Sequence, residues 1–155
     1  MISLNLIIIV LTVWVSIYVQ NNTHLYGQLM MDPHEVMKKR QYWRLITSGF
    51  VHDGYSHLGF NMFTLYFFGN AVEQYFAYIL GSTSTVAFVL FYLSALVVSD
   101  LPGFFKNKNR PGYNTLGASG GVSAMVFASI IYAPLNKICL FAGYYSFVLL
   151  LIFSM

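Results

Sequence analysis

The sequence Gly117-Ala118-Ser119-Gly120-Gly121 stands where a polar stretch gives way to a long apolar segment. A serine hydroxyl at the start of an apolar helix can simply bond a carbonyl one turn earlier. The glycines indicate more, because Gly117 and Gly121 are spaced i, i+4 and small residues let a second helix backbone approach closely. The stretch therefore predicts a helix–helix contact beside Ser119.

The segment that begins at His57 is the best candidate for this second helix. His57 and Asn61 are spaced i, i+4 and therefore share one helix face. Together with Ser119 they supply what acyl transfer needs: a nucleophile, and neutral donors for the oxyanion of a tetrahedral intermediate. A lone histidine near the end of a span is more often an interfacial anchor, but a set of polar groups in apolar segments favours a functional site. We expect the three side chains to converge on one small hydrated pocket.

Glu73 interrupts the same apolar segment further along. It lies about three turns beyond Asn61 and is offset from it around the helix. We therefore expect the Glu73 carboxylate to bond loop backbone rather than to act as an acid or base.

The composition is that of a membrane protein. The chain has 155 residues, of which 57% are hydrophobic, 18% aromatic and only 8% charged, whereas soluble domains carry about 25% charged residues. The mean hydropathy is +0.64. The net charge of +3 is spread over loops rather than gathered in a basic patch, which argues against nucleic acid as a partner.

Apolar runs separated by polar turns predict an all-α, polytopic transmembrane bundle that forms a single domain over residues 1–155. The expected spans are about 2–19, 57–80, 85–98, 117–133 and 138–155, and the polar residues 99–103 are expected to close the third. The first run has no basic residues before it and no small-residue cleavage site after it. It therefore reads as a retained span rather than a cleaved signal peptide.

The connection between the first two spans contains a helix start. In Asp32-Pro33-His34-Glu35, an N-cap residue precedes proline at the first helical position, and glutamate follows three residues after the cap. A short helix is predicted here. Its apolar side, which we expect to lie on the membrane interface, would be formed by Met30, Met31, Val36, Met37 and Trp43.

Four motifs, in order along residues 40 to 133, resemble those of the rhomboid intramembrane serine proteases. They are Tyr42-Trp43-Arg44, the stretch from His52 to Met62 with its two histidines and asparagine, Gly69-Asn70-Ala71-Val72-Glu73, and Gly117-Ala118-Ser119-Gly120. A Gly-x-Ser-Gly sequence alone would be a weak signal. Several matches in order, with plausible span spacing, make the resemblance specific.

The resemblance implies a compact helical bundle in which Ser119 is the nucleophile. His57, Asn61 and the backbone N–H of Ser119 would form the oxyanion site. It implies structural support from a second set of residues: Trp43, Arg44, His52, Glu73, Gly117, Gly120 and Gly121. No metal or organic cofactor is implied.

The chain departs from the family pattern in its histidines. Rhomboids use a Ser-His dyad whose histidine lies on a sixth span, yet only five spans are expected here and no histidine follows His57. The four histidines are His24, His34, His52 and His57, and none fits the role of the general base by motif. The sequence is therefore expected to be a fragment or a natural short form, in which activation of the serine largely disappears.

Two functions remain open. The first is an endopeptidase that cleaves transmembrane protein substrates near the surface of the lipid bilayer, favoured by the intact Ser119, His57 and Asn61. The second is a non-catalytic rhomboid-like protein that binds transmembrane helices, favoured by the missing base. A transporter is a distant third, because the polar groups cluster towards span ends and no broken helix is apparent.

The charge distribution leaves the orientation of this multi-pass protein open. Seven of the eight Lys and Arg residues lie in the loops after the first and third spans, which the positive-inside rule would place in the cytoplasm. The resemblance implies the opposite sidedness. The sequence does not say which membrane holds the protein.

Overall fold

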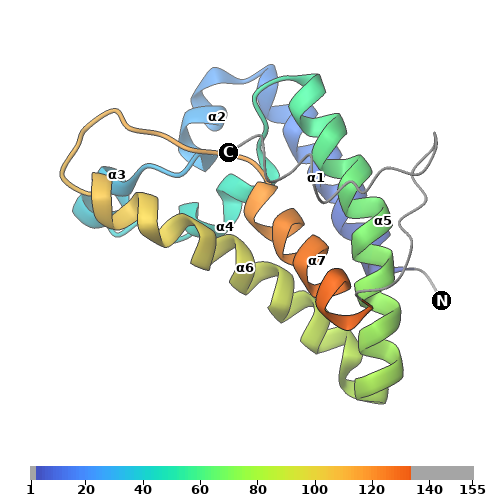
Figure 1. Cartoon of the computed structure of the whole chain (residues 1–155). Coiled ribbons are helices and arrows are strands. Elements are labelled where there is room, and N and C mark those ends of the chain that lie inside the picture. The colour runs from blue at the N-terminus through green and yellow to red at the C-terminus, as the bar shows by residue number, and fades with distance from the viewer. Residues whose placement is uncertain (1–2, 134–155) are drawn as a thin grey trace.

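The computed structural model describes residues 3–133, and these form an all-helical structure (Figure 1). The elements are α1 (Leu4–Gln20), α2 (Thr23–Leu29), α3 (Pro33–Lys39), α4 (Arg44–Thr47), η1 (Ser48–Phe50), α5 (Tyr55–Leu80), η2 (Gly81–Thr83), α6 (Ser84–Asn107) and α7 (Ser119–Tyr132). The all-α prediction is confirmed. The fifth expected span, 138–155, lies outside the described residues.

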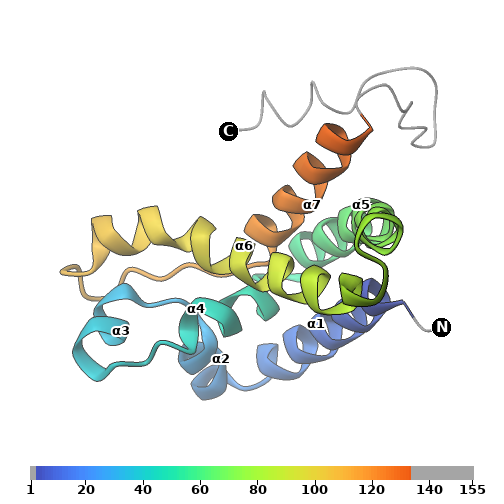
Figure 2. The same ribbon diagram turned by 90° about the horizontal axis from the view of Figure 1, so that it is seen from below.

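Helix α7 packs against both α5 and α6, and α1 packs against α5. Turned by 90°, the structure has α7 on one side of α5 and α6, and α1 to α4 on the other (Figure 2). By length and composition, one helical stretch among the described residues, Tyr55–Asn107, is apolar enough to cross a membrane. It turns back at η2 into α5 and α6, while α1 and α7 are shorter apolar helices.

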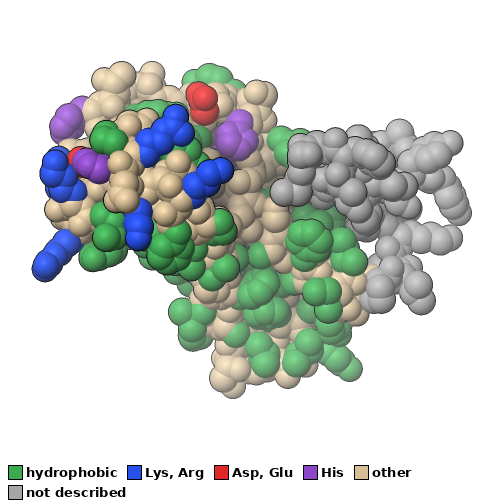
Figure 3. Space-filling model, turned by 60° about the vertical axis from the view of Figure 1, so that its left-hand side comes forward, with side chains coloured by type: hydrophobic (Ala, Val, Ile, Leu, Met, Phe, Trp, Pro, Cys, Tyr) green, Lys and Arg blue, Asp and Glu red, His purple; other side chains and the backbone are tan. Residues whose placement is uncertain are grey.

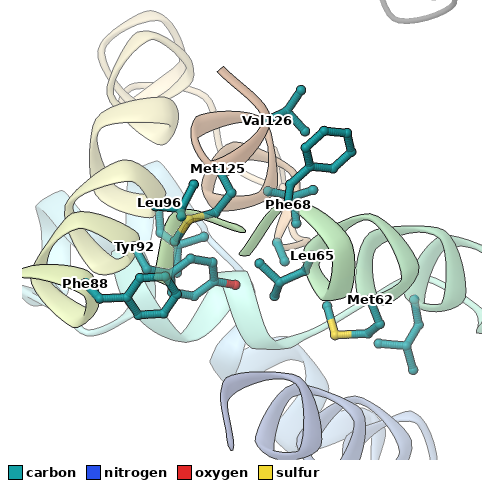
Figure 4. Packing of buried hydrophobic residues seen from close by; sticks show 12 residues of the cluster. Met62, Leu65, Phe68, Phe88, Tyr92, Leu96, Met125 and Val126 are labelled. Carbon is teal, nitrogen blue, oxygen red and sulfur yellow. The ribbon is translucent and has the colours of Figure 1, made fainter. Parts of the chain in front are cut away.

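The core lies where α5, α6 and α7 meet (Figure 4). Leu65 of α5, Tyr92 of α6 and Met125 of α7 are each fully buried. These side chains alternate with exposed apolar ones on the same helices, such as Phe63 and Val86, which are 50% and 62% exposed. The bundle therefore has an apolar core and an apolar exterior.

The basic side chains gather at one end of the molecule, whereas hydrophobic side chains are spread over the rest of the face seen in Figure 3. Lys38, Lys39 and Arg40 lie at the end of α3. Lipid offers no partner for charged groups, so an apolar exterior with one charged end suits helices that stand in a bilayer and meet water at that end.

The first helix is fixed at its N-terminus by a residue of α5. Ser3 caps α1 by accepting a hydrogen bond from the Leu6 N–H at 3.2 Å. The Glu73 carboxylate accepts bonds from the N–H groups of Leu4 and Asn5 at 2.7 and 3.2 Å, and from the Ser3 hydroxyl. A carboxylate at a helix N-terminus also meets the positive end of the helix dipole. Glu73 thus bonds backbone as expected, although that backbone belongs to the first turn of α1 rather than to a loop.

Helix α6 is longer than the expected third span. It continues past residues 99–103, with Pro102 inside it, and ends at Asn107. Proline removes one helical hydrogen bond, but α6 packs against α3 and α4. The Ser48 hydroxyl also donates to Asp100 Oδ2 at 3.2 Å. Tertiary contacts therefore outweigh the local breaker, and the expected end at residue 98 is wrong for the helix.

Helix α3 begins where the sequence predicted. Asp32 is the N-cap, its side chain accepting from the Glu35 N–H at 3.0 Å. The predicted interfacial side is only partly correct: Met37 is 50% exposed, but Met31 and Val36 are buried. These two side chains are almost fully covered, so they belong to the interior rather than to a membrane-facing surface.

Candidate active site

Ser119 is the first residue of α7, and it is exposed. The sequence predicts that this helix includes Gly117, but the helix begins two residues later. Gly117 has φ of +112°, a conformation that residues with a Cβ rarely adopt. A Cβ on Gly117 would also lie 2.9 Å from His57 Cε1. The glycine therefore turns the chain into α7 and lets the His57 ring approach the backbone two residues before Ser119.

The chain ahead of Ser119 is anchored to the segments between α1 and α5. Thr115 and Met31 exchange two backbone hydrogen bonds, of 2.9 and 3.0 Å. The Gly117 N–H donates to the Ser48 carbonyl at 2.9 Å. These bonds fix the direction in which α7 starts.

His52 provides a further anchor from the loop before α5. It is fully buried, and its Nε2 accepts from the Ala118 N–H at 3.2 Å. Its Nδ1 lies 3.0 Å from Ser16 Oγ, which donates to the Phe50 carbonyl. Because Nε2 is an acceptor, a neutral ring carries its proton on Nδ1 and donates it to Ser16. His52 thus links α1 to the residue before Ser119.

Burial, and to a lesser extent the neighbouring His57, lowers the pKa of His52 to about 4. The two rings meet edge to face, with centroids 5.1 Å apart. At neutral pH His52 is therefore uncharged and retains the lone pair that receives the Ala118 N–H.

A pH dependence of stability follows from this histidine. The unfolded chain takes up the proton near the ordinary pKa of 6.5, but the folded chain does so only near 4. Protons therefore favour the unfolded state within this window, and the free energy of unfolding should fall as pH drops from about 6.5 to 4. We expect the stability advantage of the parent over His52→Gln, measured by thermal unfolding in detergent, to be full above pH 6.5 and to shrink below it.

The matched control for this prediction is His24→Gln, which changes a histidine on the exposed surface of α2. It should leave the pH dependence of the parent unchanged. A stability difference between parent and His52→Gln that is constant from pH 7.5 to 4 would contradict the buried neutral ring.

His57 and Asn61 lie in the first turns of α5, as expected. The Asn61 side chain is buried, and its Nδ2 donates to the His57 carbonyl at 3.0 Å. This bond uses one of the two amide protons of Asn61. The His57 ring is half-buried against Gly117 and His52.

Ser119 opens into a hollow of about 600 Å³ between η1, α6 and α7. The walls include four other hydroxyl-bearing residues and one carboxylate, from Ser48, Ser99, Asp100, Thr115 and Ser123. Gly117 lines the hollow and meets the His57 ring, but neither His57 nor Asn61 is among the lining residues. The convergence of all three predicted side chains on one site therefore stays a prediction.

The glycines after Ser119 bring α7 close to α6, not to the helix of His57 as expected. A Cβ on Gly121 would lie 2.6 Å from Tyr92 Cε2, and one on Gly120 would overlap the Ser99 side chain. Tyr92 and Ser99 are spaced i, i+7 on α6. The small-residue contact is real, and at Gly120 and Gly121 its partner is α6, although α7 also packs against α5 and Gly117 meets His57.

The sequence does not predict Ser99 and Asp100 as neighbours of Ser119, because the polar residues 99–103 indicate a closing turn. The helical spacing of Tyr92, Leu96 and Ser99 could have indicated that α6 continues on the same face. Together with Asp100, this extension forms one wall of the hollow beside Ser119.

Arg44 and Trp43 differ in their surroundings. The Arg44 guanidinium is buried and donates from Nη1 to the carbonyls of Gly27 and Met30, both at 2.8 Å. It therefore holds the end of α2 against α4. Trp43 is 53% exposed, so its indole lies on the surface, as is common for tryptophan at a membrane–water interface. Within residues 3–133, no group of His, Cys, Asp or Glu side chains is arranged to hold a metal ion.

Comparisons with known proteins show to which family the chain is related. The family model described as a rhomboid domain matches residues 39–155. The chain is 28% identical over 116 residues to "Rhomboid protease GluP" of Bacillus subtilis (strain 168), covering 75% of this chain and 21% of the relative. It is 34% identical over 101 residues to "RHOMBOID-like protein 12, mitochondrial" of Arabidopsis thaliana, covering 58% of this chain and 29% of the relative.

A further relative is "RHOMBOID-like protein 6, mitochondrial" of Arabidopsis thaliana, with 31% identity over 101 residues, 64% of this chain and 29% of the relative. The chain thus spans less than a third of the length of these relatives. The family match covers most of the chain, including the Ser119 motif and the His57 helix. We conclude that this chain is an integral membrane protein that belongs to the rhomboid family.

Proposed function

We propose that Ser119 is the nucleophile of a rhomboid-type intramembrane endopeptidase that cuts transmembrane substrates near the membrane surface. The observation that carries the proposal is the position of Ser119. It is an exposed residue at the first turn of α7, beside a hollow lined mostly by small and polar residues, on backbone anchored by Thr115 and Ala118. A nucleophile needs this combination of access and fixed direction.

The start of α7 also offers donors for an oxyanion. Ala118 is the N-cap and provides no side-chain hydrogen bond to the first turn. The first N–H groups of a helix have no acceptor within the helix, and they lie at the positive end of its dipole. The N–H of Ser119 can therefore face negative charge that develops on a substrate carbonyl oxygen. His57, beside Gly117, and Asn61 would act as further donors in the proposed oxyanion site.

The reaction would be acyl transfer. Ser119 Oγ forms a bond to the carbonyl carbon, its proton passes to a general base, and the leaving amine takes up a proton as the peptide bond breaks. Both ring nitrogens of His52 are already hydrogen-bonded, and His57 is assigned to the oxyanion. We infer that the base is a histidine supplied from outside residues 1–155.

The direct test uses a longer product that contains these residues and a downstream span with a histidine. Ser119→Ala should reduce cleavage of a transmembrane substrate to background. Ser94→Ala, which changes an exposed serine on α6, should leave the rate unchanged. Equal cleavage by the parent and Ser119→Ala would refute the assignment of the nucleophile.

The second candidate function is a rhomboid-like protein that binds transmembrane helices without cutting them. It is favoured by His52, whose nitrogens are both engaged in holding the backbone. A binder would retain saturable association with substrate helices, and neither the parent nor the longer product would show cleavage that depends on Ser119.

A further inference from the structure

Ser16 differs from the other buried hydroxyl residue of α1 in what it binds. A hydroxyl inside a helix commonly bonds the carbonyl one turn earlier, and Thr12 does so, donating to the Ile8 carbonyl at 2.7 Å. Ser16 is equally buried, but it donates to the Phe50 carbonyl of η1 at 2.8 Å. The hydroxyl of Ser16 therefore serves a contact outside its own helix.

The same hydroxyl decides which nitrogen of His52 carries the proton. A hydroxyl has one proton and two lone pairs, and Ser16 gives its proton to the Phe50 carbonyl. Towards His52 Nδ1, which is 3.0 Å away, the Ser16 oxygen can therefore only accept. Burial lowers the pKa of His52 to about 4, so the ring is neutral near pH 7 and has a single N–H. This N–H lies on Nδ1, which leaves Nε2 as an acceptor.

The unprotonated nitrogen meets the backbone directly before Ser119. His52 Nε2 accepts from the Ala118 N–H at 3.2 Å, and both residues are fully buried. With the other tautomer, two N–H donors would face each other here, and a buried N–H without an acceptor is costly. A chain of hydrogen bonds with one direction thus runs from the Ala118 N–H through the imidazole ring and the Ser16 hydroxyl to a carbonyl of η1.

We propose that Ser16 is a positioning residue for the reaction at Ser119: by fixing the tautomer of His52, it sets the direction of the backbone that carries the nucleophile and its N–H. The inference rests on the proposed function and adds to it a residue of the first helix. Because α1 and α7 lie on opposite sides of α5 and α6 (Figure 2), Ser16 acts through the ring and touches neither the substrate nor the reacting atoms.

A purely structural role would make Ser16 one of several attachments between α1 and the loop before α5. Gln20, one turn further along α1, is such an attachment, because its Nε2 donates to the His52 carbonyl at 3.3 Å. This bond involves the backbone of His52 and neither of its ring nitrogens. Removing the Gln20 amide therefore weakens the attachment without acting on the tautomer, whereas removing the Ser16 hydroxyl acts on both.

The experiment observes the ring nitrogens of His52 directly. Residues 1–155 with nitrogen-15 in their histidines and alanines are studied by NMR in detergent near pH 7, where protonated and unprotonated imidazole nitrogens have well-separated resonances. The signals of His52 are those missing from His52→Gln. The parent should show one tautomer, protonated on Nδ1, and slow hydrogen exchange at the Ala118 N–H.

In Ser16→Ala, the Nδ1–H of His52 has no acceptor, so either tautomer leaves a buried N–H unpaired and the preference for Nδ1–H is lost. The Nε2–H tautomer should become populated, and hydrogen exchange at Ala118 should become about tenfold faster, as expected for the loss of one buried hydrogen bond. Ser16→Cys keeps the side chain close to its parental size but offers a much weaker acceptor. It should give the same result, which would exclude an effect of the cavity left by alanine.

Two control variants separate the tautomer from the attachment. Thr12→Val removes the other buried hydroxyl of α1, which bonds within its own helix, and should leave the tautomer unchanged. Gln20→Met should lower the midpoint of thermal unfolding and also leave the tautomer unchanged. A single Nδ1–H tautomer that survives both Ser16 variants, a parental ring protonated on Nε2, or the same mixture of tautomers in Gln20→Met would each overturn the inference.

The consequence for the reaction is measured on the longer product that contains a downstream span with a histidine. Ser16→Ala should lower kcat for a transmembrane substrate about tenfold, because a nucleophile held in the wrong direction reacts slowly. KM should stay unchanged, because Ser16 does not touch the substrate. Thr12→Val should retain both constants. An unchanged kcat in Ser16→Ala beside an altered tautomer would also overturn the inference.

Failure of this inference and failure of the proposed function are distinguishable. If the longer product cleaves its substrate in a manner that depends on Ser119, but Ser16→Ala keeps the parental tautomer and kcat, only the role of Ser16 is wrong. If nothing is cleaved while the tautomer still depends on Ser16, the chain of hydrogen bonds exists, but the protease assignment and the consequence for catalysis are wrong.

Discussion

Residues 1–155 on their own are expected to show no cleavage of a transmembrane substrate that depends on Ser119. A serine hydroxyl is a weak nucleophile until a positioned base takes its proton, and such help is typically worth about 10² to 10⁴ in rate. The chain contains four histidines, and the structure gives each of them surroundings that do not suit this task.

His52 is engaged at both nitrogens, with Ser16 and with the Ala118 N–H. A base must present an unprotonated nitrogen to the serine hydroxyl, which His52 could do only by releasing the backbone before Ser119. His57 packs against Gly117, and a residue that donates to the oxyanion cannot accept from the serine at the same moment. His24 and His34 lie on α2 and α3, outside the hollow that Ser119 lines.

The measurement is cleavage of a reconstituted transmembrane substrate by purified residues 1–155, with Ser119→Ala as the reference. Residues 1–155 and their Ser119→Ala variant should both give the background rate. When a downstream span with a histidine is added to each, only the protein that retains Ser119 should become active. Cleavage by residues 1–155 that vanishes in Ser119→Ala would contradict the prediction and assign the base to His57 or His52.

Gly121→Leu is expected to destabilise the bundle although it changes no proposed catalytic atom. A Cβ at this position would lie 2.6 Å from Tyr92 Cε2 and 3.1 Å from Leu96 Cδ2. Tyr92 is fully buried and cannot swing away without opening the core. Overpacking of this kind typically costs about 1 to 3 kcal/mol, and the branched end of leucine extends the clash. The midpoint of thermal unfolding in detergent should fall, and the first turn of α7 should shift.

Gly59→Leu makes the same substitution where there is room. Gly59 is exposed on α5, and a Cβ there meets no atom within 4 Å. Leucine also has the higher helix propensity, so this variant should unfold at or above the parental temperature. An unchanged midpoint for Gly121→Leu, beside an unchanged one for Gly59→Leu, would show that α6 and α7 are not in close contact at Gly121.

The parts of the fold that follow from local periodicity could be predicted from the sequence. The i, i+4 spacing of His57 and Asn61 placed both in the first turns of one helix, and the capping pattern at Asp32 located the start of α3. Both depend on interactions within a few residues, so no knowledge of distant segments was needed.

The errors arose where distant contacts decide the structure. Pro102 indicates a helix end, but α6 continues past it and packs against α3 and α4. The hollow beside Ser119 requires that η1 and the extension of α6 lie together, so Asp100 was not recognised as a neighbour of the serine. The spacing of Gly117 and Gly121 predicts that both lie on one helix face, but the positive φ of Gly117 places it outside the helix.

The backbone pairing of Met31 with Thr115 joins segments that are made far apart in time during translation. At ribosomal rates of about 5 to 20 residues per second, Thr115 follows Met31 by on the order of ten seconds. The hydrogen bonds to Ser48 and His52 form with a similar delay, because their donors are the N–H groups of Gly117 and Ala118. In a nascent chain that has been made only as far as α6, the carbonyls of Met31 and Ser48 and the Nε2 of His52 therefore lack these hydrogen-bond donors. Ser119 acquires its orientation only when the loop before α7 packs against them. The order of synthesis thus delays the positioning of the proposed nucleophile until most of the surrounding bundle has been made.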